Sequence, residues 1–377
     1  MRKFAFITGS RAEWGLLRPI IKALPSKVDF KVMVTGSHLS ESYGMTVNEI
    51  IKEDFPVELV DIALSGDGKL EKCAAMGVCM VGMSDALSRY KPDLAVILGD
   101  RYEILATACA CTMLGIPIAH IHGGESTEGA IDDQMRHAIT KLSYWHFASH
   151  EDYAKRIRQM GENSERIFVS GAPGIDGMKR EFASKEEVEE QLGIELNDAL
   201  LITYHPETLC KMTPAKQVNE LLVALNGFRG RSLIITGANA DCGGQEINDI
   251  LKEYCMGTNN AIFRMSLGQK LYFDTMYHSK VVVGNSSSGV IEAPVMGRMT
   301  VNIGDRQKGR IRAPSVIDCG CRVGDIVDSI GDALLMGDQK PFKGFGQPGE
   351  ISPWIARKLL EMSIPDLLRK PFVDNTE

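Results

Sequence analysis

The chain has 377 residues, and 42 Lys and Arg against 49 Asp and Glu leave a formal net charge of −7. At a usual domain size of about 150 residues, this length predicts two or three domains, each large enough to build its own core. The acidic balance lacks the basic stripe that nucleic-acid binding needs, so we expect no DNA or RNA partner. No stretch approaches the roughly 18 apolar residues of a membrane span, and the chain enters a strand candidate at Phe4 without an apolar leader. These features predict a cytoplasmic protein without a membrane partner.

The cysteines do not predict a disulfide framework, because their number, nine, is odd and the chain is long. Cys109 and Cys111, like Cys319 and Cys321, form C-x-C pairs whose spacing matches no structural zinc site. We interpret all nine cysteines as reduced packing residues.

Short runs of Val, Ile and Leu alternate with segments of helical period, which predicts βαβ units and parallel sheets buried on both faces. The strand candidates of the first half are residues 4–8, 30–34, 57–62, 94–98, 116–121, 144–148 and 167–170. Those of the second half are residues 200–204, 233–236, 261–263, 281–283 and 300–303. Helices are expected between them, for example over residues 70–88, 102–114, 132–142, 185–192, 216–225 and 270–278. Two such series predict an α/β fold of two doubly wound, Rossmann-like domains.

Gly and Pro punctuate the chain at Ser170 to Gly174, which predicts an N-terminal domain over residues 1–172 and a C-terminal domain over residues 173–350. A last amphipathic helix near Ile351 to Met362, within residues 351–377, is expected to pack back on the first domain. Parallel sheets bind ligands beyond the carboxyl ends of their strands. The predicted active site therefore lies in the cleft between the two domains.

The first strand runs into Gly9-Ser10-Arg11-Ala12-Glu13, and we expect a helix to begin at about Leu16. A glycine turn before a helix favours an anion, and Arg11 adds a cation. The alternative is an ordinary turn with a solvated arginine. A conventional NAD site is disfavoured, because G-x-G-x-x-G is absent and no acidic residue ends the second strand.

Asp100 and Arg101 follow the fourth strand, where they would serve as a base and a phosphate clamp, or as a helix cap followed by a surface charge. The next strand leads into a segment of about fourteen residues that contains His120, His122, Glu125, Glu128, Asp132 and Asp133. Such a density of imidazole and carboxylate groups indicates acid/base chemistry on a sugar carbon or ring oxygen. Metal binding by His120, His122 and Glu125 is an alternative, although H-E-x-x-H is absent. Asp132 and Asp133 would also suit a helix start.

In the second half, Pro206 ends a strand and leaves His205 at its carboxyl end, and Asn239 follows the next strand. Asn285-Ser286-Ser287-Ser288-Gly289 precede a helix expected to start near Val290, which indicates a phosphate cradle rather than a single helix cap. Glu292 would accept the hydroxyls of a ribose, and Arg306 would add a cation.

Taken together, these motifs resemble the hydrolysing UDP-N-acetylglucosamine 2-epimerase family, of the kind that serves sialic-acid and legionaminic-acid biosynthesis. The resemblance spans nearly the whole chain and rests on motifs in a fixed order, namely residues 9–13, 99–101, 120–125, 131–133, 136–141, 284–287 and 304–307. It implies a GT-B arrangement of two Rossmann-like domains. It also implies anti elimination of the nucleoside diphosphate to 2-acetamidoglucal, followed by water addition that releases N-acetylmannosamine.

The resemblance assigns roles by motif position. Asp100 and Asp132 look like the acid/base carboxylates, and His205 looks like the residue that assists departure of the diphosphate. Several relatives carry a glutamate where this chain has His122, so His122 or Glu125 would take over its task. The residues expected to bind nucleotide or phosphate are Arg11, Arg101, Asn239, Asn285, Ser286, Ser287, Gly289, Glu292 and Arg306.

We thus expect a cytoplasmic homodimer or homotetramer that binds a nucleotide sugar and needs no redox cofactor and no metal. The choice between a UDP-linked and a GDP-linked substrate stays open at this stage. The competing hypotheses are a GT-B glycosyltransferase, which would need one base rather than several, and a sensor that binds nucleotide sugars without turnover.

Overall fold

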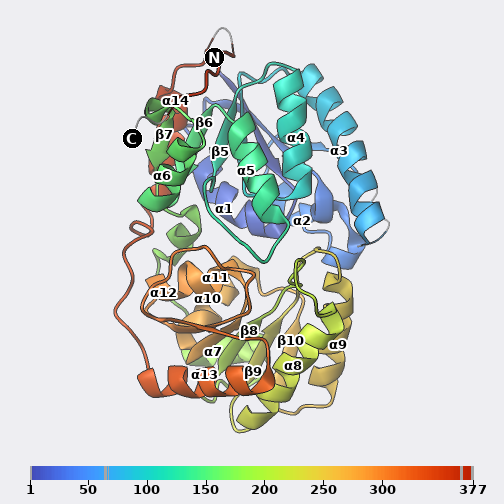
Figure 1. Cartoon of the computed structure of the whole chain (residues 1–377), viewed down its shortest axis with the longest axis vertical. Helices are drawn as coiled ribbons and strands as arrows, with labels where there is room; N and C mark the ends of the chain where they lie inside the picture. Colours follow the sequence, from blue (N-terminus) through green and yellow to red (C-terminus); the bar gives the residue numbers. More distant parts are fainter. Residues whose placement is uncertain (1, 63–65, 67, 366–367, 375–377) are drawn as a thin grey trace. The chain divides into compact units, whose positions relative to one another are not determined.

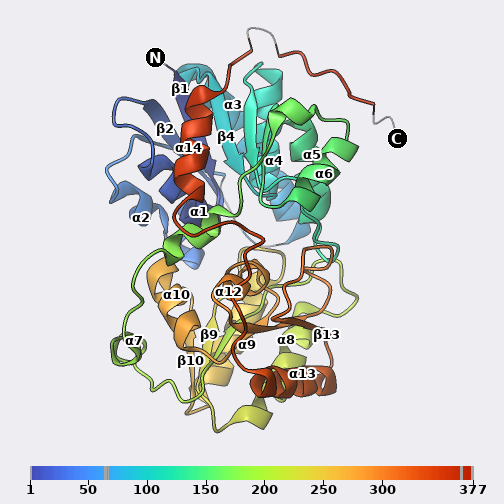
Figure 2. The same cartoon turned by 90° about the vertical axis from the view of Figure 1, so that its left-hand side faces the viewer.

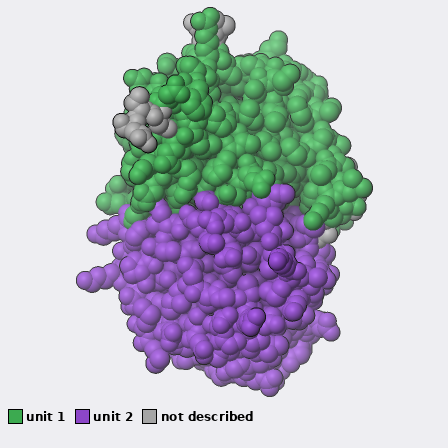
Figure 3. Space-filling model, viewed as in Figure 1, with its two compact units in different colours: residues 1–125, 132–176, 344–377 green, residues 126–131, 177–343 purple. Residues whose placement is uncertain are grey.

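The computed structural model of the chain describes residues 2–62, 66, 68–365 and 368–374. The chain divides into two compact units, coloured separately in Figure 3. Unit 1 comprises residues 1–125, 132–176 and 344–377, and unit 2 comprises residues 126–131 and 177–343.

In the described part of unit 1, seven parallel strands form a sheet in the order β3-β2-β1-β4-β5-β6-β7. Figure 1 labels β5, β6 and β7 of this sheet. The strands are β1 (Lys3–Thr8), β2 (Asp29–Val34), β3 (Val57–Leu59), β4 (Leu94–Leu98), β5 (Ile118–Ile121), β6 (Trp145–Ala148) and β7 (Ile167–Val169). The helices that connect or cover them are α1 (Arg11–Lys22), α2 (Val47–Ile51), α3 (Lys69–Tyr90), α4 (Tyr102–Met113), α5 (Asp132–Leu142), α6 (Glu151–Gln159) and α14 (Ile351–Glu361). The last of these packs against α1 (Figure 2).

The core of unit 1 forms because the central strands are apolar on both faces. All five residues of β4 are buried, and Ile97 packs in one cluster with Met83 of α3 and Ile104 of α4. The register pairs Leu98 with Ile121, so β4 and β5 end at the same edge of the sheet. This alignment brings the residues that follow the two strands together.

In the part of unit 2 that the structure describes, six parallel strands run in the order β10-β9-β8-β11-β12-β13. The strands are β8 (Leu200–Thr203), β9 (Leu233–Thr236), β10 (Ala261–Arg264), β11 (Val281–Gly284), β12 (Met299–Ile303) and β13 (Val316–Cys319). The helices are α7 (Lys185–Leu192), α8 (Pro214–Leu225), α9 (Gly244–Met256), α10 (Gly268–His278), α11 (Ser287–Val290), α12 (Glu292–Val295) and α13 (Val323–Met336). The two parallel sheets with interleaved helices confirm the predicted pair of doubly wound domains.

Four expectations from the sequence are wrong in detail. The first helix begins at Arg11 rather than Leu16, because Ser10 and Glu13 close a capping box around its first turn. The edge strand β13 was not expected, since Asp318 interrupts its apolar run and its residues are only partly buried. The helix expected near Val290 begins at Ser287, for which Ser286 is the cap. Cys73 is exposed on α3 and therefore is not a packing residue.

None of the helices in the described part of the chain combines the length and the apolar character needed to cross a membrane.

Candidate active site

Asp100 follows β4 and forms an ion pair with Arg136 of α5. Arg136 is 1% exposed and also donates to Asp133 at 3.1 Å and to the backbone oxygen of Glu125 at 3.2 Å. Burial alone would lower the pKa of Arg136, but Asp100, Glu125 and Asp133 together raise it, so the guanidinium stays charged. Asp100 makes no cap, because the cap position of α4 belongs to Arg101, which forms no side-chain cap bond. The carboxylate is therefore held by a tertiary ion pair.

His122 and Glu125 form a second side-chain pair, immediately after β5. His122 Nδ1 lies 2.5 Å from Glu125 Oε1, and Glu125 is fully buried. His122 has a φ of +65°, an unusual backbone conformation for a residue with a side chain, and it directs the imidazole toward Glu125. The pair has the composition of an acid/base dyad, in which the carboxylate orients the ring.

His120 does not join this pair, although it shares the strand. Its Nε2 lies 2.7 Å from the backbone oxygen of Gly99 and its Nδ1 lies 3.3 Å from Thr140 Oγ1. Burial lowers the pKa of His120 to about 3, so the ring is neutral and structural. Among the residues that the structure describes, no three His, Cys, Asp or Glu side chains are grouped as ligands of a metal ion.

The β1–α1 turn holds the buried carboxyl group of Glu13. Glu13 Oε2 accepts the backbone N–H of Gly9 at 2.6 Å and that of Ser10 at 3.2 Å. Arg11, at the first position of α1, lies 3.6 Å from Glu49. Arg101 is almost fully buried and donates to Glu103 at 2.8 Å. Both arginines thus begin helices at the carboxyl edge of the sheet, each beside a carboxylate.

Asp132 is the first residue of α5 and is half-buried. It precedes Asp133 and Arg136 on the same helix, so its backbone is fixed by the contacts that Arg136 makes with β4. An acidic residue in the first turn is also stabilised by the helix dipole, so the helix-start interpretation and the catalytic one are compatible.

In unit 2, His205 follows β8 and is held by the ends of two neighbouring strands. The amide of Asn285 accepts the backbone N–H of His205 at 2.7 Å and donates to its backbone oxygen at 2.9 Å. His205 Nδ1 accepts the backbone N–H of Asn239 at 3.1 Å. A backbone N–H can only donate, so Nδ1 is unprotonated and the neutral ring carries its proton on Nε2. His205 is therefore prepared to donate a hydrogen bond.

Ser286 belongs to a chain of hydroxyl groups that the sequence did not suggest. Ser288 Oγ donates to Ser286 Oγ at 3.1 Å and lies 2.6 Å from the hydroxyl of Tyr272, which is 3.4 Å from Thr203 Oγ1. Ser286 Oγ also accepts the backbone N–H of Ser288 at 3.4 Å. These hydrogen-bonded hydroxyl groups anchor the turn at Ser286 to β8 and α10. Ser287 is the first residue of α11.

The other predicted nucleotide-binding residues of unit 2 lie around the same strand ends. Arg306 donates to the backbone oxygen of Asn285 at 3.3 Å and lies 3.4 Å from Asp241. Glu292 begins α12 and is 9% exposed. Gly289 is buried against β12, where a Cβ would come within 2.8 Å of Thr300 Cγ2. Gly289 therefore permits close packing of α11 on the sheet.

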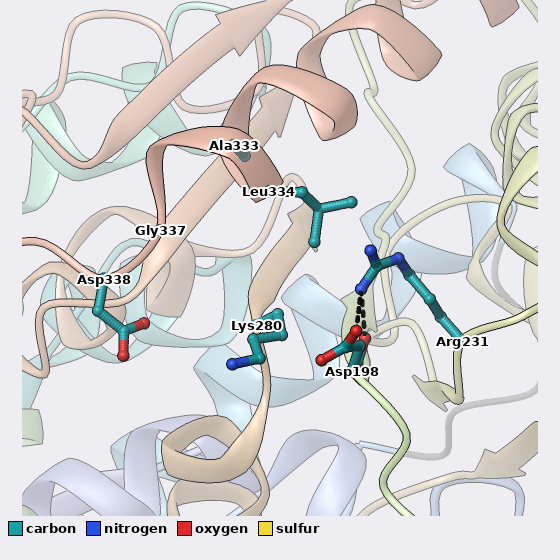
Figure 4. A pocket seen from close by; sticks show the side chains of 7 residues that line it. All are labelled: Asp198, Arg231, Lys280, Ala333, Leu334, Gly337 and Asp338. Atoms are coloured by element: carbon teal, nitrogen blue, oxygen red, sulfur yellow. Dashed lines mark hydrogen bonds and ion pairs between the residues drawn. The ribbon is translucent and has the colours of Figure 1, made fainter.

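Two hollows of unit 2 lie elsewhere, beside the amino ends of its strands, and Figure 4 shows one of them. One of about 190 Å³ is lined by Asp198, Arg231 and Lys280, and a neighbouring one of about 460 Å³ shares Asp198 and Lys280 with it. Asp198 and Arg231 already form an ion pair of 3.1 Å. Because ligands of such sheets bind at the carboxyl ends, we do not assign the site to these hollows.

Arg136, Ser149 and Tyr272 received no role from the sequence, yet each organises a predicted site residue. Arg136 stands four residues after Asp132 on one helix, a spacing that places both on one helical face. Ser149 follows β6 directly, as His122 follows β5. The sequence positions of Arg136 and Ser149 could therefore have indicated a role at the site. Tyr272 lies in the middle of a helix, and its sequence position gives no such indication.

The fold is GT-B-like, with two Rossmann-like domains. It is similar to the crystal structure of UDP-GlcNAc 2-epimerase from Neisseria meningitidis bound to UDP-GlcNAc, with a TM-score of 0.78 and 19% identity over 96% of this chain and 100% of that one.

The family model of UDP-N-acetylglucosamine 2-epimerase matches residues 22–347. The chain belongs to this family of nucleotide-sugar 2-epimerases. It is 42% identical, over 84% of each chain, to the GDP/UDP-N,N'-diacetylbacillosamine 2-epimerase (hydrolyzing) of Campylobacter jejuni. It is 35% identical, over 89% of this chain and 88% of the relative, to the UDP-N,N'-diacetylbacillosamine 2-epimerase (hydrolyzing) of Legionella pneumophila.

Proposed function

We propose that the protein is a hydrolysing 2-epimerase, which converts a nucleoside-diphosphate-linked 2-acetamido sugar into the free 2-epimer and the nucleoside diphosphate. Base-promoted loss of the C2 proton expels the diphosphate from C1 and forms a 2-acetamidoglycal, to which water then adds. The hydrogen leaves C2 as a proton, so the reaction needs no redox cofactor. The observation that carries the proposal is the network of one ion pair and several hydrogen bonds that joins Asp100, Arg136, Glu125 and His122 at the carboxyl ends of β4 and β5.

Inversion at C2 requires a proton to leave one face of the sugar and another to arrive on the opposite face, so two acid/base groups are needed. Asp100, Asp132 and the His122–Glu125 pair are the groups that we assign to this task. Arg136 holds the carboxylate of Asp100 in place through an ion pair, which suits a group close to a site of proton transfer.

Unit 2 is proposed to bind the departing diphosphate. The Nε2–H of His205, the hydroxyl groups of Ser286 and Ser287, and the guanidinium of Arg306 are donors suited to phosphate oxygens. Donors of this kind stabilise the negative charge that grows as the C1–O bond breaks. Asn239, Asn285, Gly289 and Glu292 would contact the nucleotide, and Arg11 and Arg101 would add positive charge from unit 1.

The names of the relatives bear on the sugar. Two relatives that align over most of this chain are named for N,N'-diacetylbacillosamine, one as a GDP- or UDP-linked and one as a UDP-linked sugar. We therefore favour the 2,4-diacetamido sugar over N-acetylglucosamine, whose product would be N-acetylmannosamine.

The test incubates the purified protein in deuterated water with the UDP- and GDP-linked forms of both sugars, in four separate reactions. We expect free 2-epimer with deuterium at C2 from at least one donor, and no product from the Asp100→Asn variant. A glycosyltransferase would leave C2 undeuterated and require an acceptor. A sensor would bind a donor and return it intact.

We also propose that the protein works as a homo-oligomer. The outward side of α3 exposes Leu70 at 78%, Val81 at 73% and Val78 at 46%, an apolar surface that a monomeric enzyme rarely leaves in water.

A further inference from the structure

Ser149, Glu125 and His122 form a continuous hydrogen-bonded chain at the carboxyl ends of β5 and β6. Ser149 Oγ donates to Glu125 Oε1 at 2.7 Å, and the same oxygen lies 2.5 Å from His122 Nδ1. We infer that the imidazole of His122 takes the proton from C2 of the sugar, and that Glu125 and Ser149 are positioning residues that act through it. This inference rests on the proposed function.

The sheet fixes the position of this hydrogen-bonded series of side chains. The backbone N–H of His122 donates to the backbone oxygen of Phe147 at 3.0 Å, which continues the β5–β6 register for one residue beyond the strand. In the turn that follows, a Cβ on Gly124 would come within 2.4 Å of the backbone oxygen of Tyr153. His122 and Glu125 therefore face each other across a turn that has little room to rearrange.

The contacts also decide where the protons lie. Glu125 Oε1 accepts the hydroxyl of Ser149, and its backbone oxygen accepts Arg136, so the surroundings favour the ionised carboxylate. An ionised Glu125 can only accept, which puts the proton of the neutral imidazole on Nδ1 and the free lone pair on Nε2. Charged groups from three other elements face this turn. Asp100, which follows β4, and Asp133 of α5 both pair with Arg136, and Arg156 of α6 donates to the backbone oxygen of Gly124.

His122 Nε2 is buried and has no hydrogen-bond partner among the described residues. A buried ring nitrogen without a partner is unfavourable in a structural histidine. His120 illustrates the contrast, since both of its ring nitrogens have hydrogen-bond partners. Nδ1 of His137 and Nδ1 of His146 are also buried without a partner in the described part of the chain, but neither residue lies at the carboxyl end of a strand. The unpartnered nitrogen is the atom that a general base must keep available for substrate.

The proposed step balances as follows. Nε2 forms a bond to the C2 proton, the C2–H electron pair becomes the C1=C2 double bond, and the C1–O pair departs with the diphosphate. Glu125 stabilises the imidazolium cation that results. In the second stage an aspartic acid delivers a proton to the opposite face of C2, and water adds at C1 and gives up a proton that restores the aspartic acid. The imidazolium releases its proton to solvent, which completes the cycle. Glu125 does not contact the sugar in this scheme.

A double-mutant cycle tests whether Glu125 and Ser149 act through the imidazole of His122 or directly on the substrate. We expect His122→Gln to lower kcat on the order of 10³-fold, and Glu125→Gln and Ser149→Ala to lower it about 10²-fold and 10-fold. In the His122→Gln background, neither second substitution should lower kcat further. The acid limb of the wild-type kcat/KM profile should move to lower pH in Glu125→Gln, because the imidazolium loses its counter-charge. His150→Asn, which exchanges the cap of α6 for another capping residue, is the control and should keep wild-type activity.

A multiplicative loss in the double variants would overturn the inference, since Glu125 would then act on substrate directly. A wild-type kcat in His122→Gln would overturn it as well. If Glu125→Gln does not fold, the Ser149→Ala cycle gives the same decision. Absence of epimerisation by the wild-type protein on all four donors would instead overturn the proposed function, and the inference with it.

Discussion

Glu13 shows how strongly the surroundings change a single residue at the carboxyl edge of the first sheet. It is 4% exposed, and burial together with the neighbouring charge of Glu103 raises its pKa to about 8. The protonated form is therefore the one that the fold accommodates. Two backbone N–H groups donate to one of its oxygens, which orients the carboxyl group without charging it.

This pKa predicts how stability depends on pH. The folded chain keeps the proton of Glu13 up to a pH of about 8, whereas the unfolded chain releases it near 4.5. The contribution to stability is thus complete below pH 4.5 and is lost as the pH rises toward 8. Glu13→Gln resembles the protonated acid and should gain about 1–3 kcal/mol over wild type at pH 8 relative to pH 5. Urea unfolding at both pH values measures this, with Glu190→Gln, an exposed residue of α7, as the control. Parallel behaviour of all three proteins would contradict the prediction.

At the scale of elements, α5 depends on the last described residues of the chain. Its amino end carries Asp132 and Arg136, and its carboxyl end lies beside Lys370. Lys370 Nζ donates to the backbone oxygen of Thr140 at 3.4 Å and to that of Lys141, and it lies 2.9 Å from the buried Glu162. A cation at the carboxyl end of a helix stabilises both the free carbonyl groups and the dipole.

Lys370→Met should therefore lower the free energy of unfolding by about 1–3 kcal/mol, because Glu162 loses a partner and the end of α5 loses its cap. The matched control is Lys358→Met, whose partner Glu361 is half-exposed, and about 0–1 kcal/mol is expected there. Denaturant unfolding of the two variants and the wild type measures these differences in the free energy of unfolding. Equal losses in both variants would show that the cap contributes nothing.

At the scale of the whole molecule, α3 presents apolar residues on two sides. Its inner side packs Cys79, Met83 and Leu87 into the core, while Leu70 and Val81 remain on the surface. Gly77 lies between the two exposed residues, and a Cβ there would contact nothing. Two copies of α3 crossing antiparallel at Gly77 would place Val81 opposite Cys73, a large residue against a small one, as a two-fold interface requires.

We accordingly expect Val81→Lys to convert the oligomer into smaller species, because a charge would be buried in the interface. Sedimentation velocity of wild type and variant measures the change. The control is Leu335→Lys, at a residue of α13 that is also highly exposed. An unchanged sedimentation coefficient in Val81→Lys would exclude α3 as the interface.

The sequence alone was sufficient for most strands of the two sheets and for the family to which the chain belongs. The strands β4 and β9 and the helices α5 and α7 have the predicted bounds, because buried parallel strands require continuous apolar runs and helices require a 3.6-residue period. The sequence also contained the start of α1, since Ser10 and Glu13 have the spacing of a capping box. We did not predict this start, because we interpreted the same residues as an anion-binding turn.

Partners and proton positions were decided only by the tertiary structure. That Asp100 pairs with Arg136, that Ser149 reaches Glu125, and that His205 keeps its proton on Nε2 follow from strand ends that lie far apart in the chain and adjacent in the sheet. Local patterns report which residues are buried or helical, because these depend on near neighbours. They cannot report hydrogen-bond partners, because these are selected by the order in which the strands assemble.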